Sequence, residues 1–402
     1  MSTMESKTPV SARRLLFWIH IWVGLAFGLP FALLGITGSI LVYEQPINAF
    51  FNPAPQATAV GAMQSPQAIL DAGTKARDGL SATSLSLPQA AGDPAIVRLT
   101  QRGGPRGVRA PNYQALVDPV SLQVLDLRTG QRSAFMGWAH DFHGSLLIGG
   151  RQGRSIIGWM GVGMLALGLS GIVLWWPRQN NWRGAYGVKK NARGWLFHRQ
   201  LHGTAGITSW LLFMVLSFSG IVIAFPQSTT ALVRTVLFQG PSTTAPVVGP
   251  GAQQVRVTPV EGVQRIDVDK ALAVATAAAP NARPVIIFFP NGREQPYRFG
   301  LLPNGAAQGA PTINVFVDPY RSEAISVRDP WAGDIGDNVM TWQRPLHTGR
   351  GTNEIYKALI FIVGLIPPLF AFTGIAMWWA KRRGRTRVSA GRDAIPQGVA
   401  AE

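Results

Sequence analysis

Histidine is the residue type in this sequence with the clearest potential for chemistry. The chain has 402 residues, six of them histidine and none of them cysteine. The absence of thiols excludes a disulfide framework, Cys-ligated zinc or iron–sulfur sites and covalently attached c-type haem. A metal or redox centre would therefore need imidazole or carboxylate ligands. All six histidines lie close to the ends of long apolar segments: His20, His140, His143, His198, His202 and His347.

Four of these histidines recur at matching positions in two halves of the chain. Gly38 follows His20 at the same spacing as Gly220 follows His202. His143 precedes a Ser-Gly-Ile motif and a Trp-Trp pair. His347 precedes Thr-Gly-Ile and Trp-Trp at nearly the same spacing. Ionisable side chains at membrane depth are costly unless they are used. The repetition therefore favours a function over incidental interfacial histidines.

Two imidazoles on facing helices are the usual way to hold a haem from both sides. The repeat predicts an inner pair, His20 with His202, and an outer pair, His143 with His347. The other two histidines have no counterpart in the opposite half, but each lies within one helical turn of a paired histidine. We therefore predict two b-type haems as cofactors. The predicted ligands of the haem iron are His20, His202, His143 and His347, with His198 and His140 as alternates.

These histidines need helices to position them, and the composition indicates that the helices span a membrane. The chain is 47% hydrophobic and only 14% charged. Because about 20 apolar residues cross a bilayer, we predict four transmembrane helices. They are Leu15–Tyr43, Ser155–Pro177, Gln200–Pro226 and Ala358–Ala380.

The net charge of +17 follows mostly from topology. Lys and Arg cluster before the first predicted span, in the short loop between the second and third, and after the fourth. The positive-inside rule then places both termini in the cytoplasm and the two long loops outside. Because the basic residues are divided among three short segments beside the membrane, nucleic-acid binding is not expected.

Each long loop has an Ala-rich helical stretch followed by about three strand-like runs. Val117-Asp118-Pro119 and Val317-Asp318-Pro319 have the composition of hairpin turns. The predicted fold is an α-helical integral membrane protein with four transmembrane helices in two tandem repeats and two small extracytoplasmic α+β domains. The predicted segments are 1–43 (N-terminus and first helix), 44–154 (outer domain), 155–177 (helix), 178–199 (cytoplasmic loop), 200–226 (helix), 227–357 (outer domain), 358–380 (helix) and 381–402 (tail).

Four short motifs resemble those of the PepSY-associated transmembrane proteins. They are His20–Leu25, His143–Leu147, Ser170–Pro177 and His202–Ile207. The resemblance extends over nearly the whole chain, and the two outer domains are similar to PepSY domains. It implies a siderophore-iron reductase, similar to the ferrioxamine reductase type, with two b-type haems in the inner membrane.

The sequence thus leads to an expected function and two rivals. We expect an inner-membrane oxidoreductase that transfers electrons from a quinol or a cytoplasmic donor to a periplasmic ferric siderophore. The partners would be the siderophore, the donor and the lipid bilayer. The first rival is a non-enzymatic membrane protein whose PepSY-like domains bind or regulate an envelope peptidase. A permease is weaker because four spans leave little room for a substrate path.

Overall fold

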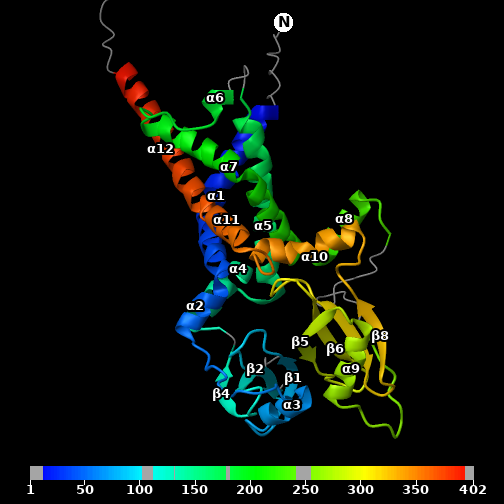
Figure 1. Ribbon diagram of the computed structural model, residues 1–402. Coiled ribbons are helices and arrows are strands. Elements are labelled where there is room, and N and C mark those ends of the chain that lie inside the picture. The colour runs from blue at the N-terminus through cyan, green and yellow to red at the C-terminus, as the bar shows by residue number, and fades with distance from the viewer. Residues whose placement is uncertain (1–11, 102–111, 131, 178–181, 241–254, 394–402) are drawn as a thin grey trace, which may run out of the picture. The chain divides into compact units, whose positions relative to one another are not determined.

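The computed structural model describes residues 12–101, 112–130, 132–177, 182–240 and 255–393. The chain forms two compact units (Figure 1). The helical unit comprises the residues up to 42, residues 139–224 and the residues from 354 onward. The sheet unit comprises residues 43–138 and 225–353. Each unit therefore combines segments from both halves of the sequence.

Four helical segments are long and apolar enough to cross a membrane, in agreement with the predicted number. They are α1 (Ala12–Val42), α5 (Gly150–Trp175), α7 (Gly194–Ala224) and the pair α11 (Glu354–Gly364) with α12 (Ile366–Asp393). The third begins at Gly194, earlier than the predicted Gln200, so His198 lies within the helix. The fourth is interrupted at Leu365, and Pro367 in the first turn of α12 explains why the new helix starts there.

Small residues allow the helices of this unit to approach closely. A Cβ atom on Gly35 of α1 would lie 2.3 Å from the carbonyl oxygen of Gly364, at the end of α11. Nearby, the Ser39 hydroxyl donates to the carbonyl oxygen of Phe361 at 2.8 Å. Between α5 and α7, the Trp210 indole donates to the Gly168 carbonyl oxygen at 3.1 Å. Close packing and interhelical hydrogen bonds are the main sources of association between helices in lipid.

Basic side chains gather at one end of the helical unit. The Arg13 guanidinium, at the start of α1, donates to the carbonyl oxygen of Leu174 at 2.9 Å, near the end of α5. Lys381 of α12 lies 5.8 Å from the centre of the Phe17 ring of α1. The first and last basic clusters of the sequence therefore meet at the same end, as the predicted topology requires. The loop between α5 and α7 contains the short helix α6 (Trp182–Ala185).

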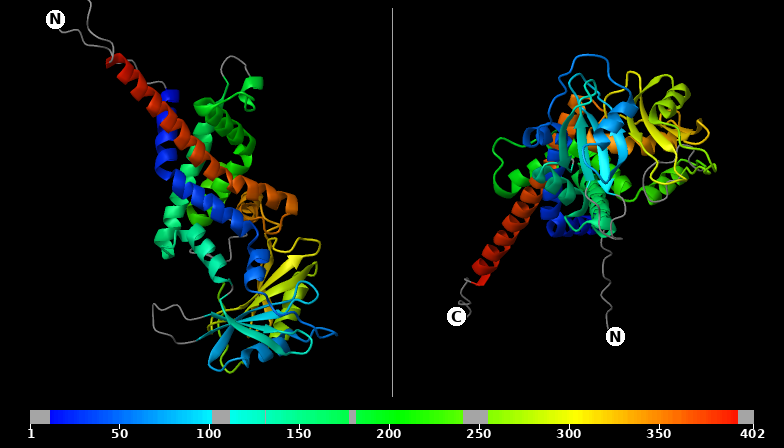
Figure 2. Two further views of the ribbon diagram at one scale, coloured as in Figure 1. Left: turned by 90° about the vertical axis from the view of Figure 1, so that its left-hand side faces the viewer. Right: turned by 90° about the horizontal axis from the view of Figure 1, so that it is seen from below.

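The sheet unit is built around one antiparallel sheet of eight strands, in the order β4-β3-β2-β1-β5-β6-β7-β8. Separate domains with about three strands each were expected. Instead each half contributes four strands, and β1 pairs with β5 to join them (Figure 2). This pairing satisfies backbone groups that two separate sheets would leave at their edges. The strands are β1 (Leu80–Ser86), β2 (Ala95–Gln101), β3 (Asn112–Val117), β4 (Val124–Thr129), β5 (Ala282–Phe288), β6 (Tyr297–Pro303), β7 (Ile313–Asp318) and β8 (Glu323–Arg328).

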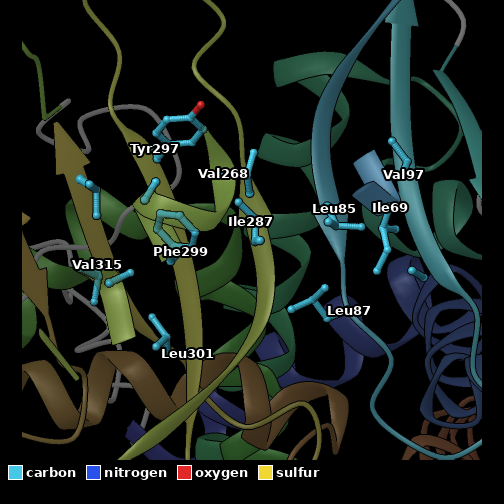
Figure 3. Packing of buried hydrophobic residues seen from close by; sticks show 14 of the residues in the cluster. Ile69, Leu85, Leu87, Val97, Val268, Ile287, Tyr297, Phe299, Leu301 and Val315 are labelled. Carbon is cyan, nitrogen blue, oxygen red and sulfur yellow. The ribbon is translucent and has the colours of Figure 1, made fainter. Parts of the chain in front are cut away.

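One face of the sheet forms a hydrophobic core with helices α3 (Pro66–Thr74) and α9 (Val268–Ala278). Alternate strand residues supply this face, and Figure 3 shows Leu85, Val97, Ile287 and Phe299 among them. Their spacing follows the period of two expected for strands with one buried face. The other residues of these strands point to the second face of the sheet, turned away from α3 and α9.

Both Val-Asp-Pro motifs form the predicted hairpin turns, between β3 and β4 and between β7 and β8. Asp118 is buried, and its carboxylate accepts backbone hydrogen bonds from Val120 and Ser121 within the turn. It also accepts from Thr58 and Ala59 in the preceding loop. Asp318 accepts in the same way from the two corresponding backbone groups of its own turn. The buried aspartates thus fix both turns.

Three further helices flank the sheet in the sequence: α2 (Glu44–Phe51), α8 (Pro226–Val236) and α10 (Ile335–Thr348). Helices α8 and α10 are joined by a buried ion-pair cluster. Arg234 of α8 donates to Asp334 and Asp337 at 2.8 and 2.9 Å. These two carboxylates raise the pKa of Arg234, and Arg234 in turn lowers the pKa of Asp334. Helix α4 (Ala134–Ser145) connects the sheet to α5 in the sequence and carries two of the histidines.

Candidate functional site

The predicted inner pair of histidines comes together between two helices of the helical unit. His20 lies on α1 and His202 on α7, and their ring centres are 6.3 Å apart. A separation of about 6 Å is expected when two imidazole nitrogens each lie about 2 Å from one shared metal ion. The distance between the two rings is therefore compatible with one metal ion held between them.

Each imidazole of the pair is held by a hydroxyl group from a neighbouring helix. The Nδ1 atom of His20 lies 2.8 Å from the hydroxyl oxygen of Ser170 on α5. The Nδ1 atom of His202 lies 2.8 Å from the hydroxyl oxygen of Thr373 on α12. Ser170 and Thr373 occupy the first position of the Ser-Gly-Ile and Thr-Gly-Ile motifs, which the two halves share. The two contacts are thus equivalent in the sequence as well as in geometry.

The carbonyl partners of the two hydroxyls favour one tautomer for both histidines. A hydroxyl has a single proton to donate, and the Ser170 hydroxyl donates it to the carbonyl oxygen of Ala166 at 2.8 Å. The Thr373 hydroxyl likewise donates to Leu369 at 2.7 Å. In this arrangement both hydroxyls accept from the imidazole, and the proton of each ring lies on Nδ1. This leaves the lone pair on Nε2, the form in which a neutral imidazole binds a metal.

The helix positions next to the pair carry glycine, which has no side chain. Glycine follows each histidine by one helical turn, at Gly24 and Gly206. No described atom lies within 4 Å of the position of a Cβ on Gly24, and the nearest to Gly206 is the tip of the Phe370 ring at 3.9 Å. A planar macrocycle could approach the helix backbone at both positions. The donor set therefore fits a haem, and neither glycine places a side chain beside it.

His198 differs from His202 in its hydrogen bonding. It lies one turn before His202 on α7. The centres of its ring and of the Phe372 ring are 5.6 Å apart, in an edge-to-face arrangement. Its Nδ1 atom is buried and has no hydrogen-bond partner in the described part of the chain. Metal-ligating histidines almost always donate their second ring nitrogen to a fixed acceptor. This contrast favours His202 as the ligand, in agreement with the preference that the repeat suggests.

His143 lies at the end of α4 and packs against α1. Its Nδ1 atom lies 3.0 Å from the carbonyl oxygen of Leu34, so this nitrogen carries the proton and donates it. The ring fits against Gly38, where a Cβ atom would lie 2.9 Å from its Cε1 atom. His140, in contrast, is exposed and lies 3.4 Å from the neighbouring Asp141 carboxylate. The anchored environment favours His143 over His140.

His347 lies in the last turn of α10, which ends at Gly349 in the left-handed conformation. It belongs to the sheet unit, whereas His143 belongs to the helical unit. The pairing of these two histidines stays a prediction. Within the described residues, no three side chains of the types His, Asp and Glu converge as they would around a zinc ion.

The two hydroxyl partners are the part of the site that sequence reasoning did not identify. Ser170 and Thr373 were noticed as members of a repeated motif, but not as contacts of the histidines. The available signal was the conservation of a hydroxyl between the two copies while the side chain changed from Ser to Thr. The change from Ser to Thr keeps the hydroxyl group, and with it the acceptor oxygen.

Comparison with known proteins bears on the whole chain. No curated protein is similar enough to count as a relative. The sequence model of one family, described as the PepSY-associated TM region, matches residues 17–381, which include all six histidines and nearly all of the four candidate spans. The chain is therefore a membrane protein that belongs to the PepSY-associated TM family.

Proposed function

We propose that this protein is an inner-membrane di-haem b-type reductase that passes electrons across the membrane to a periplasmic ferric siderophore. The observation that carries the proposal is the inner histidine pair. The ring centres of two imidazoles from the two halves of the chain are 6.3 Å apart, and the Nδ1 atom of each lies 2.8 Å from a hydroxyl oxygen of the same motif. Both retain Nε2 for one shared metal.

In this function the protein residues hold and orient the cofactor. His20 and His202 would hold one haem, while Ser170 and Thr373 would fix the orientation of both imidazole rings. His143 and His347 would bind the second. Bound haem supplies reversible one-electron chemistry, and the axial imidazoles and their surroundings set its potential.

The orientation follows from the charges beside the spans. The basic end of the helical unit would face the cytoplasm, with both termini. The sheet unit would then lie in the periplasm. A quinol or a cytoplasmic donor would supply one electron for each Fe(III) that becomes Fe(II). Hard oxygen ligands such as those of siderophores hold Fe(II) much less tightly, so reduction releases the iron.

The test is the haem content and absorbance spectrum of the purified full chain and of single histidine variants. We expect a Soret band corresponding to two haems per chain. His20→Ala and His202→Ala should each remove about half of it, and His143→Ala should remove the other half. His198→Ala is the matched control on the same helix and should keep the full band.

A second measurement tests the reaction itself. Protein reduced under anaerobic conditions is mixed with a ferric siderophore and an Fe(II) chelator, and the appearance of the coloured Fe(II) complex is followed. Haem-free protein, or a Soret band unchanged in all three alanine variants, would refute the proposal. Capture of an envelope peptidase by haem-free protein would support the peptidase-regulator alternative instead.

A further inference from the structure

The second face of the sheet carries arginines at matching positions in the two halves. Arg98 lies on β2 and Arg298 on β6, each the second strand of its half. Arg128 on β4 and Arg328 on β8 form another matching pair. The residues on either side of Arg98 and Arg298 are buried in the core, so alternation directs both arginines away from α3 and α9. The two halves therefore present the same cationic positions on one surface.

The strand register aligns the central arginines in one row. Arg98 pairs with Ser84 of β1, Ser84 pairs with Phe288 of β5, and Phe288 pairs with Arg298. The row thus crosses the junction between β1 and β5, where the two halves meet. Three interstrand spacings of about 4.8 Å separate the two arginine backbones by about 14 Å. This separation is within the span of one ligand of siderophore size that contacts both arginines.

Aromatic rings support the arginines of the second half. The guanidinium carbon of Arg298 lies 3.6 Å above the centre of the Phe288 ring, and that of Arg328 lies 5.3 Å above Phe316. Stacking of this kind fixes the plane of a guanidinium and directs the N–H groups of Arg298 to the edge of the stack. Burial lowers the pKa of Arg298 to about 10 and also lowers that of Arg98. These cations have therefore lost part of their hydration.

Among the described residues, no carboxylate neutralises Arg298. Arg128, near one edge of the sheet, forms an ion pair with Asp126. Arg298 forms no ion pair within the described residues, and its polar contact is the side-chain oxygen of Asn314 at 3.5 Å. A partly dehydrated cation attracts an anion more strongly than one in bulk water, because the effective dielectric constant is lower. Charge complementarity therefore specifies an anionic ligand.

We infer that this arginine row binds the substrate, and that the substrate is a ferric chelate with a net negative charge, such as a catecholate complex. The inference rests on the proposed function, since it names the class of siderophore. Anionic oxygens of the chelate would accept hydrogen bonds from Arg98 and Arg298 across the row. A cationic complex such as ferrioxamine B would be disfavoured at this surface. The row thus selects a different substrate from the one that the family resemblance implies.

The experiment measures equilibrium binding to the full chain in neutral detergent. Gallium(III) replaces iron in both probes, so that no electron transfer occurs. Gallium tricatecholate is the anionic probe and gallium desferrioxamine B is the cationic one. We expect the anionic complex to bind at least about tenfold more tightly, since hydrogen bonds to charged groups contribute on that scale. Its affinity should fall as salt is raised from low to high concentration.

Variants locate the site. Arg98→Gln and Arg298→Gln should each weaken binding of gallium tricatecholate about tenfold. Arg256→Gln is the matched control, because Arg256 is exposed, lies outside the strands and pairs with Glu294. It should leave binding unchanged. Arg298→Lys keeps the charge but loses the planar stacking, and should lie between the wild type and Arg298→Gln.

The outcomes separate this inference from the proposed function. Equal binding of the two gallium complexes would overturn the inference, as would unchanged binding in both glutamine variants. The comparison of probes needs only the wild-type chain, so it remains decisive even if a variant fails to fold. The haem spectrum is an independent readout. Arginine-dependent binding by haem-free protein would support the anion site and refute the reductase.

Discussion

The hydroxyl groups of Ser170 and Thr373 allow the proposed role of the inner pair to be tested without touching a histidine. Thr373→Val keeps the shape of the side chain and removes only its oxygen. The helix loses little stability, because the carbonyl oxygen of Leu369, which accepted the hydroxyl proton, can still accept the backbone N–H of its helical partner. The imidazole of His202 loses its acceptor at 2.8 Å, and its Nδ1–H is left unpaired beside the position of Thr373, which is fully buried.

An unpaired buried donor costs about 1–3 kcal/mol, and loss of such an outer partner typically weakens metal binding roughly 10- to 100-fold. We therefore expect Thr373→Val and Ser170→Ala each to weaken haem binding by about that factor at the inner site. Transfer of haem to excess apomyoglobin measures the rate of loss. The reduction potential is a second readout: without the hydrogen bond the imidazole is a poorer donor, the ferric form is less stabilised, and the potential should rise.

Two control variants make this prediction specific. Thr373→Ser keeps the acceptor oxygen and should behave like the wild type. Thr208 on α7 has the same type of hydroxyl bond to a carbonyl one turn earlier, but it is exposed. Thr208→Val should therefore leave haem loss and the potential unchanged. If Thr373→Val matched Thr208→Val in both measurements, the hydroxyl would have no part in holding a ligand.

Two further predictions concern other parts of the chain. Gly38→Ala should displace His143, because the new methyl group would lie 2.9 Å from its Cε1 atom. We expect overpacking to lower the free energy of unfolding by about 1–3 kcal/mol and the absorbance spectrum to lose the outer haem selectively. Backbone hydrogen bonds hold the pKa of Asp118 below its ordinary value. The contribution of Asp118 to the stability of the sheet unit should therefore be complete above about pH 4 and be lost as the pH falls toward the folded-state pKa. Thermal unfolding between pH 3 and pH 6 would measure this loss.

Each of these two predictions has its own control. No described atom lies within 4 Å of a Cβ on Gly144, next to His143, so Gly144→Ala should keep both haems. Equal haem loss in both glycine variants would contradict the steric explanation. Asp118→Asn should lower stability at neutral pH and flatten its dependence on pH in the acid range. An unchanged acid transition in this variant would assign the dependence to other carboxylates.

Much of the fold could be predicted because its signals are local. An apolar run long enough to cross a bilayer needs no tertiary information, and the four spans follow from it. The Val-Asp-Pro turns were predicted for the same reason, since the buried carboxylates of Asp118 and Asp318 bond to their own turns. The joining of both halves into one sheet was not predicted. It depends on pairing between β1 and β5, which lie about half the chain apart and show no local sign of their register.

The candidate site shows the same division between local and distant information. The repeat selected His20 and His202, because copied spacing can be read from one sequence. It could not show that Ser170 and Thr373 reach them, since each contact joins two helices separated by more than a hundred residues. For the same reason, the choice between His202 and His198 depended on repeat position alone. In the structure the two differ physically, because only His202 has a partner for Nδ1.

The tautomers of the inner pair bear on whether these histidines are merely structural. Two imidazoles that both carry their proton on Nδ1 present two Nε2 lone pairs, and two acceptors cannot hydrogen-bond to each other. In these tautomers His20 and His202 thus do not hydrogen-bond to each other in an apolar bundle, where unsatisfied polar groups are costly. A shared electrophile resolves this conflict, and a haem iron is one that binds both nitrogens at once. A structural pair would instead place a proton between the rings, with one Nδ1 turned away from its hydroxyl. The arrangement with both Nδ1–H groups directed outward is the one expected if the two side chains serve a metal.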